Sequence, residues 1–97
     1  MEEIMVVEEK PVMKQVGKLI ITLAYGFYDI IMVSDDKKFL RNERKRLMKE
    51  GYKPTMISNS IFESPALVIA TTSALREAKE IAKDVLGGNM RRLEVKN

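Results

Sequence analysis

The chain has 97 residues, of which 45% are hydrophobic and 32% are charged, a balance typical of one folded globular domain rather than of a disordered segment. It contains neither Cys nor His, which excludes a disulfide framework, a thiolate metal site and a hydrolytic triad built on histidine. We therefore predict a single domain over residues 1–97 that is not an enzyme.

The first part of the chain predicts a strand followed by a helix. Ile4 to Glu8 is a β-rich run, and Pro11 stands where the first turn of a helix tolerates proline. Apolar residues then recur at helical spacing, and Gly26 is placed to end the helix. These apolar residues are Val12, Met13, Val16, Leu19, Ile20 and Leu23.

The outward face of this predicted helix carries a stripe of small residues and one isoleucine. The stripe consists of Gly17, Ile21 and Ala24, and it lies beside Lys14 and Lys18. Such a surface suggests close packing against another element. Either the loop around Phe62 or the last helix covers the stripe, or it is the interface of a homodimer.

The middle of the chain predicts a buried strand and then a basic helix. Asp29 to Val33, DIIMV, is nearly continuous in apolar residues, as in a strand that is covered on both faces. Ser34-Asp35-Asp36 offers N-cap side chains for the helix, and Gly51 ends it.

The last third predicts two strands, a helix and an edge strand. Thr55 to Ser60 is a weaker strand candidate, a turn at Glu63-Ser64-Pro65 separates it from the next, and Ala66 to Ala70 reads as a buried strand. Thr71-Thr72-Ser73 caps a helix that Gly87-Gly88 ends. The apolar face of this helix consists of Leu75, Ala78, Ala82, Val85 and Leu86. Met90 to Val95 alternates like an edge strand.

The resulting order is β-α-β-α-β-β-α-β. Its βαβ units predict an α/β fold, a two-layer sandwich in which helices pack on a mixed sheet. The chain is too short for a doubly wound fold to be favoured.

Positive charge is concentrated in the second helix. Residues 37–53 hold eight of the seventeen Lys and Arg and two of the fourteen acids, which gives this segment +6 and leaves −3 for the rest. One stripe of the helix, opposite Leu40 and Leu47, contains Lys38, Arg41, Asn42, Lys45 and Lys49. Cations in line suit a polyanion such as DNA or RNA, whereas the alternative is a solvated surface helix.

Two smaller groups of polar residues admit two interpretations each. Asp35 and Asp36 follow a buried strand, where paired carboxylates can hold Mg²⁺, but helix capping explains them more simply. Thr71, Thr72 and Ser73 open a helix and form a possible anion site, although no Gly-rich loop accompanies them and capping is again favoured. We predict neither a metal nor a cofactor.

Several features of the segment from about Ile4 to Val33 form one pattern: KPVM from Lys10 to Met13, Val16 and Leu23 at fixed offsets, Gly26 and DIIMV. This pattern resembles the opening of the Alba family of archaeal chromatin and RNA-binding proteins. It implies a small dimer with a β-α-β-α-β-β fold that binds nucleic acid without marked sequence preference, and it places Lys10 at the family's nucleic-acid-contacting lysine.

The chain departs from that family in two places. Ser34-Asp35-Asp36 replaces a basic, Gly-containing loop, and a third helix over residues 74–86 precedes the last strand where the family has a long basic hairpin. The resemblance thus implies an Alba-like fold with an extra C-terminal helix and strand.

Two functions from different classes follow. The first is an Alba-like homodimer that binds DNA or RNA through Lys10, Lys38, Arg41, Lys45 and Lys49. The second is a non-enzymatic module that binds a small anionic ligand or a protein partner.

The start Met1-Glu2-Glu3 does not resemble a signal peptide and no apolar run approaches a membrane span, so we expect a cytoplasmic protein. Abundant Lys and Glu without Cys, His or Trp are typical of a hyperthermophile.

Overall fold

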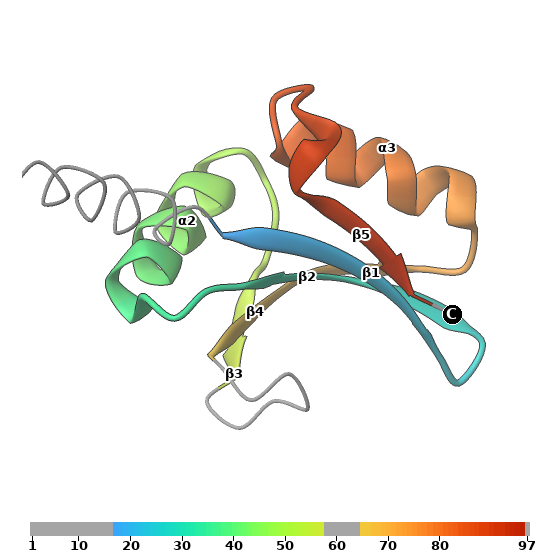
Figure 1. Ribbon diagram of the computed structural model, residues 1–97, viewed down its shortest axis with the longest axis horizontal. Helices are drawn as coiled ribbons and strands as arrows, with labels where there is room; N and C mark the ends of the chain where they lie inside the picture. Colours follow the sequence, from blue (N-terminus) through green and yellow to red (C-terminus); the bar gives the residue numbers. More distant parts are fainter. Residues whose placement is uncertain (1–16, 58–64, 97) are drawn as a thin grey trace, which may run out of the picture.

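The computed structural model describes residues 17–57 and 65–96, which form an α/β fold with a five-stranded mixed sheet and two helices (Figure 1). The strands are β1 (Lys18–Ala24), β2 (Phe27–Val33), β3 (Thr55–Ile57), β4 (Ala66–Thr72) and β5 (Leu93–Lys96). The helices are α2 (Lys37–Lys49) and α3 (Leu75–Val85), and a 3₁₀ turn, η1 (Met90–Arg92), precedes β5.

The sheet has the strand order β3-β4-β2-β1-β5. Neighbouring strands are antiparallel except for β1 and β5, which are parallel. The chain passes from β4 over β2 and β1 to β5, and α3 lies in this crossover connection. Both helices cover the same face, and one hydrophobic core lies between them and the sheet. The predicted two-layer arrangement with a mixed sheet is therefore compatible with the structure.

The prediction of a helix that extends to Gly26 is wrong for the described part of that segment. Lys18–Ala24 is a strand that pairs along its whole length with β2, from Lys18 opposite Val33 to Ala24 opposite Phe27. The order β-α-β-α-β-β-α-β is thus not confirmed, and neither is the helix that the Alba resemblance implies here. The expected strand from Ile4 to Glu8 and the first part of the expected helix lie outside the described residues.

The predicted interface stripe is also corrected. Because β1 is a strand, alternate residues face opposite sides, and Leu19 and Ile21 enter the core under the helices with no exposed surface. Gly17 is buried as well, and a Cβ at this position would lie 2.6 Å from Cε2 of Phe39. Gly17, Ile21 and Ala24 therefore do not form an exposed small-residue surface.

Three of the predicted strands are found, one of them with a different start. DIIMV lies in β2 and ALVIA lies in β4, as predicted. The last strand is an edge of the described sheet, but it begins at Leu93, because Met90–Arg92, the first half of the predicted strand, forms the 3₁₀ turn. The start of the last helix differs, because Thr71 and Thr72 belong to β4 and the N-cap is Ala74, which makes no side-chain capping bond. Thr71-Thr72-Ser73 is therefore not the cap of α3.

A two-residue turn joins β1 and β2. Tyr25 has φ 53° and Gly26 has φ 82°, and two left-handed residues in succession are typical of a type I′ turn. Tyr25 is fully exposed, so its side chain gains no burial that would offset the cost of this conformation.

We expect Tyr25→Asn to stabilise the protein by about 0.5–1 kcal/mol, because Asn tolerates the left-handed region better than Tyr does. Gly26→Ala should instead destabilise it by about 1 kcal/mol, although a Cβ there meets nothing within 4 Å. Urea unfolding followed by circular dichroism measures both changes. Equal losses of stability in the two variants would contradict the turn type.

Candidate nucleic-acid interface

The basic helix α2 begins at a side-chain cap. Oδ1 of Asp36 accepts hydrogen bonds from the backbone N–H groups of Lys38 at 2.9 Å and Phe39 at 3.2 Å. Oγ of Ser34 in turn accepts from the N–H of Asp36 at 3.1 Å. The predicted N-cap is confirmed, and the carboxylate of Asp36 is thereby committed to the start of the helix.

The orientation of α2 follows from its apolar residues. Leu40 and Leu47, seven positions apart, have no exposed surface and pack into the core against the sheet. Residues on the opposite side of the helix must then face solvent, because successive residues are rotated by about 100°.

Arg46 joins α2 to the end of α3 and engages Glu43 within α2 and Glu50 just after it. Its guanidinium donates to Glu43 at 2.8 and 3.2 Å, to Glu50 at 3.1 Å and to the backbone carbonyl of Val85 at 3.1 Å. The hydrogen bond with Glu43 raises the pKa of Arg46, so the guanidinium stays charged. The sequence analysis missed this cluster, although spacings of three and four residues from Arg46 indicate it.

Tyr52 makes a second connection between the two helices. Its hydroxyl donates to Oδ2 of Asp84 at 2.8 Å. Burial raises the pKa of Tyr52 to about 12, and the hydrogen bond to Asp84 adds to this shift. The segment that follows α2 is therefore attached to α3 as well.

The four predicted binding cations remain on the outer side of α2. Lys38, Arg41, Lys45 and Lys49 are exposed, as is Asn42 between them. We call these four cations the basic stripe. None of them forms an ion pair with another residue in the ranges 17–57 and 65–96. At 1.5 Å per residue, the stripe extends for about 16 Å along the helix.

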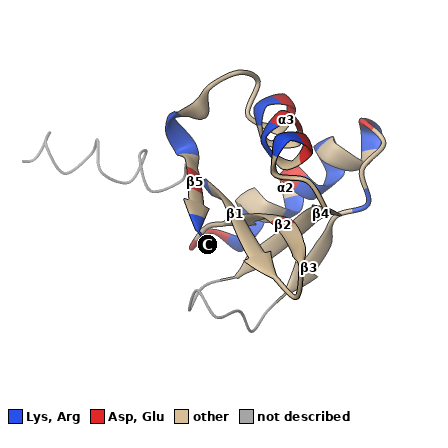
Figure 2. Ribbon diagram, turned by 90° about the vertical axis from the view of Figure 1, so that its right-hand side faces the viewer, with Lys and Arg blue, Asp and Glu red and all other residues tan. Residues whose placement is uncertain are grey.

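Other charges are distributed less favourably for a polyanion. Figure 2 shows Lys and Arg mixed with Asp and Glu along α3. Arg44 donates a hydrogen bond from Nε to the backbone carbonyl of Pro54 at 3.3 Å. Its guanidinium therefore contributes to the fold, and Arg44 is not part of the basic stripe. Lys10, which the Alba resemblance adds to the site, lies outside the described residues.

The structure places carboxylates beside the possible anion site. The hydroxyl of Thr71 donates to Oδ1 of Asp29 at 2.7 Å, and that of Thr72 donates to Oε1 of Glu77. Ser73 is exposed next to them. Two carboxylates that accept from these hydroxyls repel an anion, and this geometry argues against the site.

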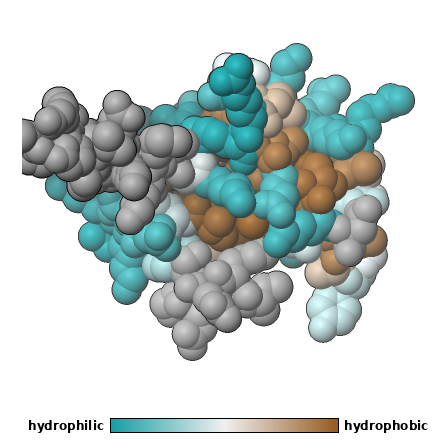
Figure 3. Space-filling model, viewed as in Figure 1, coloured by the Kyte–Doolittle hydropathy of each residue, from teal (hydrophilic) through white to brown (hydrophobic). Residues whose placement is uncertain are grey.

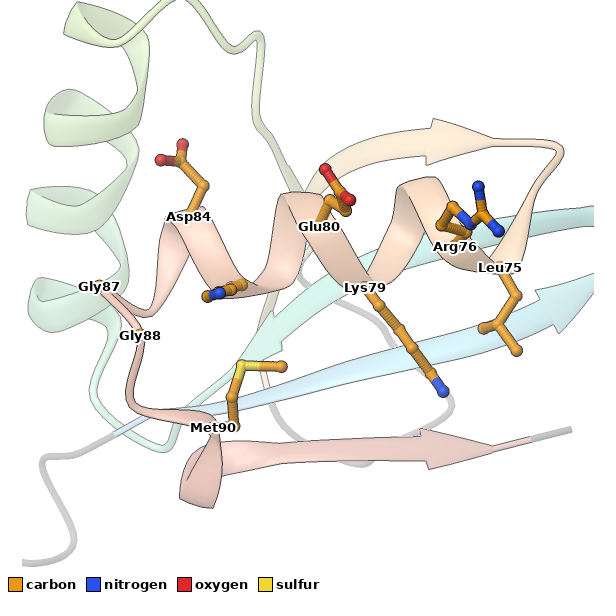
Figure 4. A pocket seen from close by; sticks show the side chains of 9 residues that line it. Leu75, Arg76, Lys79, Glu80, Asp84, Gly87, Gly88 and Met90 are labelled. Atoms are coloured by element: carbon orange, nitrogen blue, oxygen red, sulfur yellow. The ribbon is translucent and has the colours of Figure 1, made fainter.

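A groove of about 860 Å³ runs along α3 beside η1 (Figure 4). Leu75 and Met90 point into it and Lys79 extends along its side, whereas Glu80 and Asp84 belong to its lining but direct their carboxylates away from it. Lys83 and the pair Gly87-Gly88 complete one wall. The groove thus combines an apolar floor with two lysines, and the sequence patterns did not indicate it.

Comparisons with protein-family models, curated proteins and solved structures find no match. Among the described residues, no cluster of acidic side chains could hold a metal ion. Nor does either of the two described helices have the length and apolar character needed to cross a bilayer.

We expect Asp36→Ala to destabilise the protein by about 1 kcal/mol, because two backbone N–H groups lose their acceptor. Asp36→Asn should cost only a few tenths of that, because Asn also caps helices. Chemical denaturation measures both values, with the exposed Asp35→Ala as the control. A loss in the control equal to that of Asp36→Ala would contradict the assignment of the cap.

Proposed function

We propose that this protein binds DNA or RNA without marked sequence preference, through contacts between the basic stripe of α2 and phosphate groups. The observation that carries the proposal is the exposure of Lys38, Arg41, Lys45 and Lys49 in one line, with no ion pair to any residue in the described ranges. A polyanion releases counterions when such cations neutralise its phosphates, which drives binding.

The arrangement of the acids supports the same proposal. Glu43 and Glu50 are the two acids of the basic segment, and both are held by Arg46 on the side of α2 that faces α3. They therefore lie away from the basic stripe. Among the described residues, the outer side of α2 therefore carries positive charge, apart from Asp35 and the capping Asp36 at the start of the helix.

Weak sequence preference follows from the kind of side chain. Phosphate contacts by Lys and Arg position a protein on nucleic acid but do not read bases. Lys10 is part of this proposal only through the Alba resemblance, as is the homodimer that would present two basic stripes.

The alternative function is a non-enzymatic module that binds a small anionic ligand. The groove beside α3 supports it better than the possible anion site at Thr71 to Ser73 that the sequence suggested. The groove beside α3 offers apolar side chains from Leu75 and Met90 and positive charge from Lys79 and Lys83. An amphipathic anion fits these residues better than it fits Thr71 and Thr72.

Binding should fall steeply with salt. With four phosphates neutralised, the logarithm of the association constant should fall with a slope of about −3.6 for duplex DNA, or roughly 100-fold between 50 and 200 mM salt. Replacing Lys38, Arg41, Lys45 and Lys49 by Ala should flatten this slope nearly to zero. Fluorescence anisotropy with duplex DNA and with a structured RNA measures it.

The matched control removes four cations elsewhere. The variant with Arg76, Lys79, Lys83 and Arg91 replaced by Ala has the same net charge as the α2 variant, and its substitutions lie on α3 and η1. It should retain the parental slope. Equal losses of affinity in the two variants would show that net charge, and not the basic stripe, determines binding. The absence of binding at 50 mM salt would contradict the proposal and leave the groove beside α3 as the candidate site.

Asp35→Asn should tighten binding about two- to fivefold at low salt, because it removes an exposed negative charge near Lys38, and the gain should vanish at high salt. Titrations at two salt concentrations measure it. Glu80→Gln on α3 changes net charge equally and serves as the control. If both variants gain the same affinity, Asp35 has no local effect and the nucleic acid does not pass the start of α2.

A further inference from the structure

The strand β5 is the outer strand of the described sheet on the side of β1. It pairs with β1 from Leu93 opposite Leu19 to Lys96 opposite Thr22, and its other edge meets no further strand among residues 17–57 and 65–96. Figure 1 shows β5 in front of the rest of the sheet. A strand at the edge of a sheet can pair with a further strand.

The helices leave this strand partly uncovered. The helix α3 packs on β1, β2 and β4, whereas Val95 on the same face of β5 is 40% exposed. Met90, just before the strand, is 38% exposed. Figure 3, which has the viewpoint of Figure 1, shows hydrophobic surface among hydrophilic side chains near β5 and α3. An uncovered apolar strip thus accompanies the strand edge.

Charges alternate with apolar residues along β5. Glu94 and Lys96 point to the face opposite the helices, where Glu94 bonds Lys18 at 3.1 Å and Lys96 at 3.6 Å. The hydrogen bond from Lys18 lowers the pKa of Glu94, so this carboxyl is ionised at neutral pH. The strand therefore carries one negative and one positive charge at equal distances on either side of Val95.

We propose that β5 pairs with β5 of a second copy of this chain, antiparallel and with the two-fold axis at Val95. In this register Glu94 of each copy lies opposite Lys96 of the other, so that the symmetry provides the ion pair twice. Val95 lies opposite its own counterpart on the face of the helices. Two five-stranded sheets then form one continuous sheet.

The charge pattern also selects this register among the symmetric ones. A two-fold axis at Glu94 would place two carboxylates opposite each other, and an axis at Lys96 would place two ammonium groups opposite each other, both of which are unfavourable. An axis at Leu93 would place Glu94 opposite Arg92, but Arg92 belongs to η1 and not to the strand. The self-complementary sequence around Val95 is what an isologous contact between identical chains requires. A different protein would need no such symmetry.

The pairing gives the homodimer named in the proposed function a specific interface, and it depends neither on nucleic acid nor on the basic stripe, so it can be tested separately from nucleic-acid binding. A pair of four-residue strands buries less than the roughly 1,600 Å² of a standard interface, and we therefore expect a dissociation constant in the micromolar range. Sedimentation velocity of the full chain at about 100 μM and low salt, a concentration chosen for that range, shows the dimer.

Two charge reversals test the register. Glu94→Lys gives a chain with two cations on β5, and Lys96→Glu gives a chain with two acids, so each variant alone places like charges opposite each other across the axis. Each should dimerise at least tenfold more weakly than the parent. A one-to-one mixture restores both opposite-charge pairs in the heterodimer and should sediment as a dimer again.

The mixture also separates a lost interface from a lost fold, because misfolded chains would not recover. Circular dichroism of each variant provides the second check, since Glu94→Lys also removes the bond to Lys18. Lys79→Glu on α3 is the control and should dimerise like the parent. A monomeric parent at 100 μM, single variants that dimerise like the parent, or a mixture that stays monomeric would each overturn the proposal.

Discussion

The arrangement of the two helices depends on the hydrogen bonds that the guanidinium of Arg46 donates. It connects α2 to the last carbonyl of α3 and binds Glu43 and Glu50 at the same time. Hydrogen bonds from a cation to carboxylates are stronger than neutral ones, and the fork of Arg serves several acceptors in one geometry. Together with the hydrogen bond from Tyr52 to Asp84, this side chain connects the two helices, and it holds Glu43 and Glu50 on the side of α2 that faces α3.

The fold was predictable where local patterns have one solution. In α2, the cap at Asp36, the buried Leu40 and Leu47 and the stop at Gly51 all agree with the sequence pattern. The segment Lys18–Ala24 is different, because a short apolar run fits a helical period and a strand period equally well. Its pairing with β2 decides the outcome, and the turn was not recognisable because Tyr occupies a position where Asn or Gly is usual.

The candidate site shows the same division. Exposure of Lys38 and Lys45 follows from the helical period once the buried side is known, so the basic stripe could be predicted. The hydrogen bond from Thr71 to Asp29 could not be predicted, because the two residues are brought together only by the pairing of β2 with β4. The groove beside α3 likewise depends on where η1 and β5 return to the sheet.

The parallel pairing of β1 with β5 has a consequence for the order of folding. Nε of Arg92 donates to the carbonyl of Gly17 at 2.6 Å across 75 positions of the chain, and β1 and β5 are similarly far apart in sequence. During synthesis, the hairpin of β1 and β2 can form early, whereas the other edge of β1 stays open until residues 93–96 leave the ribosome. Closure of that edge is a non-local step whose entropic cost slows folding, and until it occurs β1 presents the aggregation-prone edge of the nascent protein.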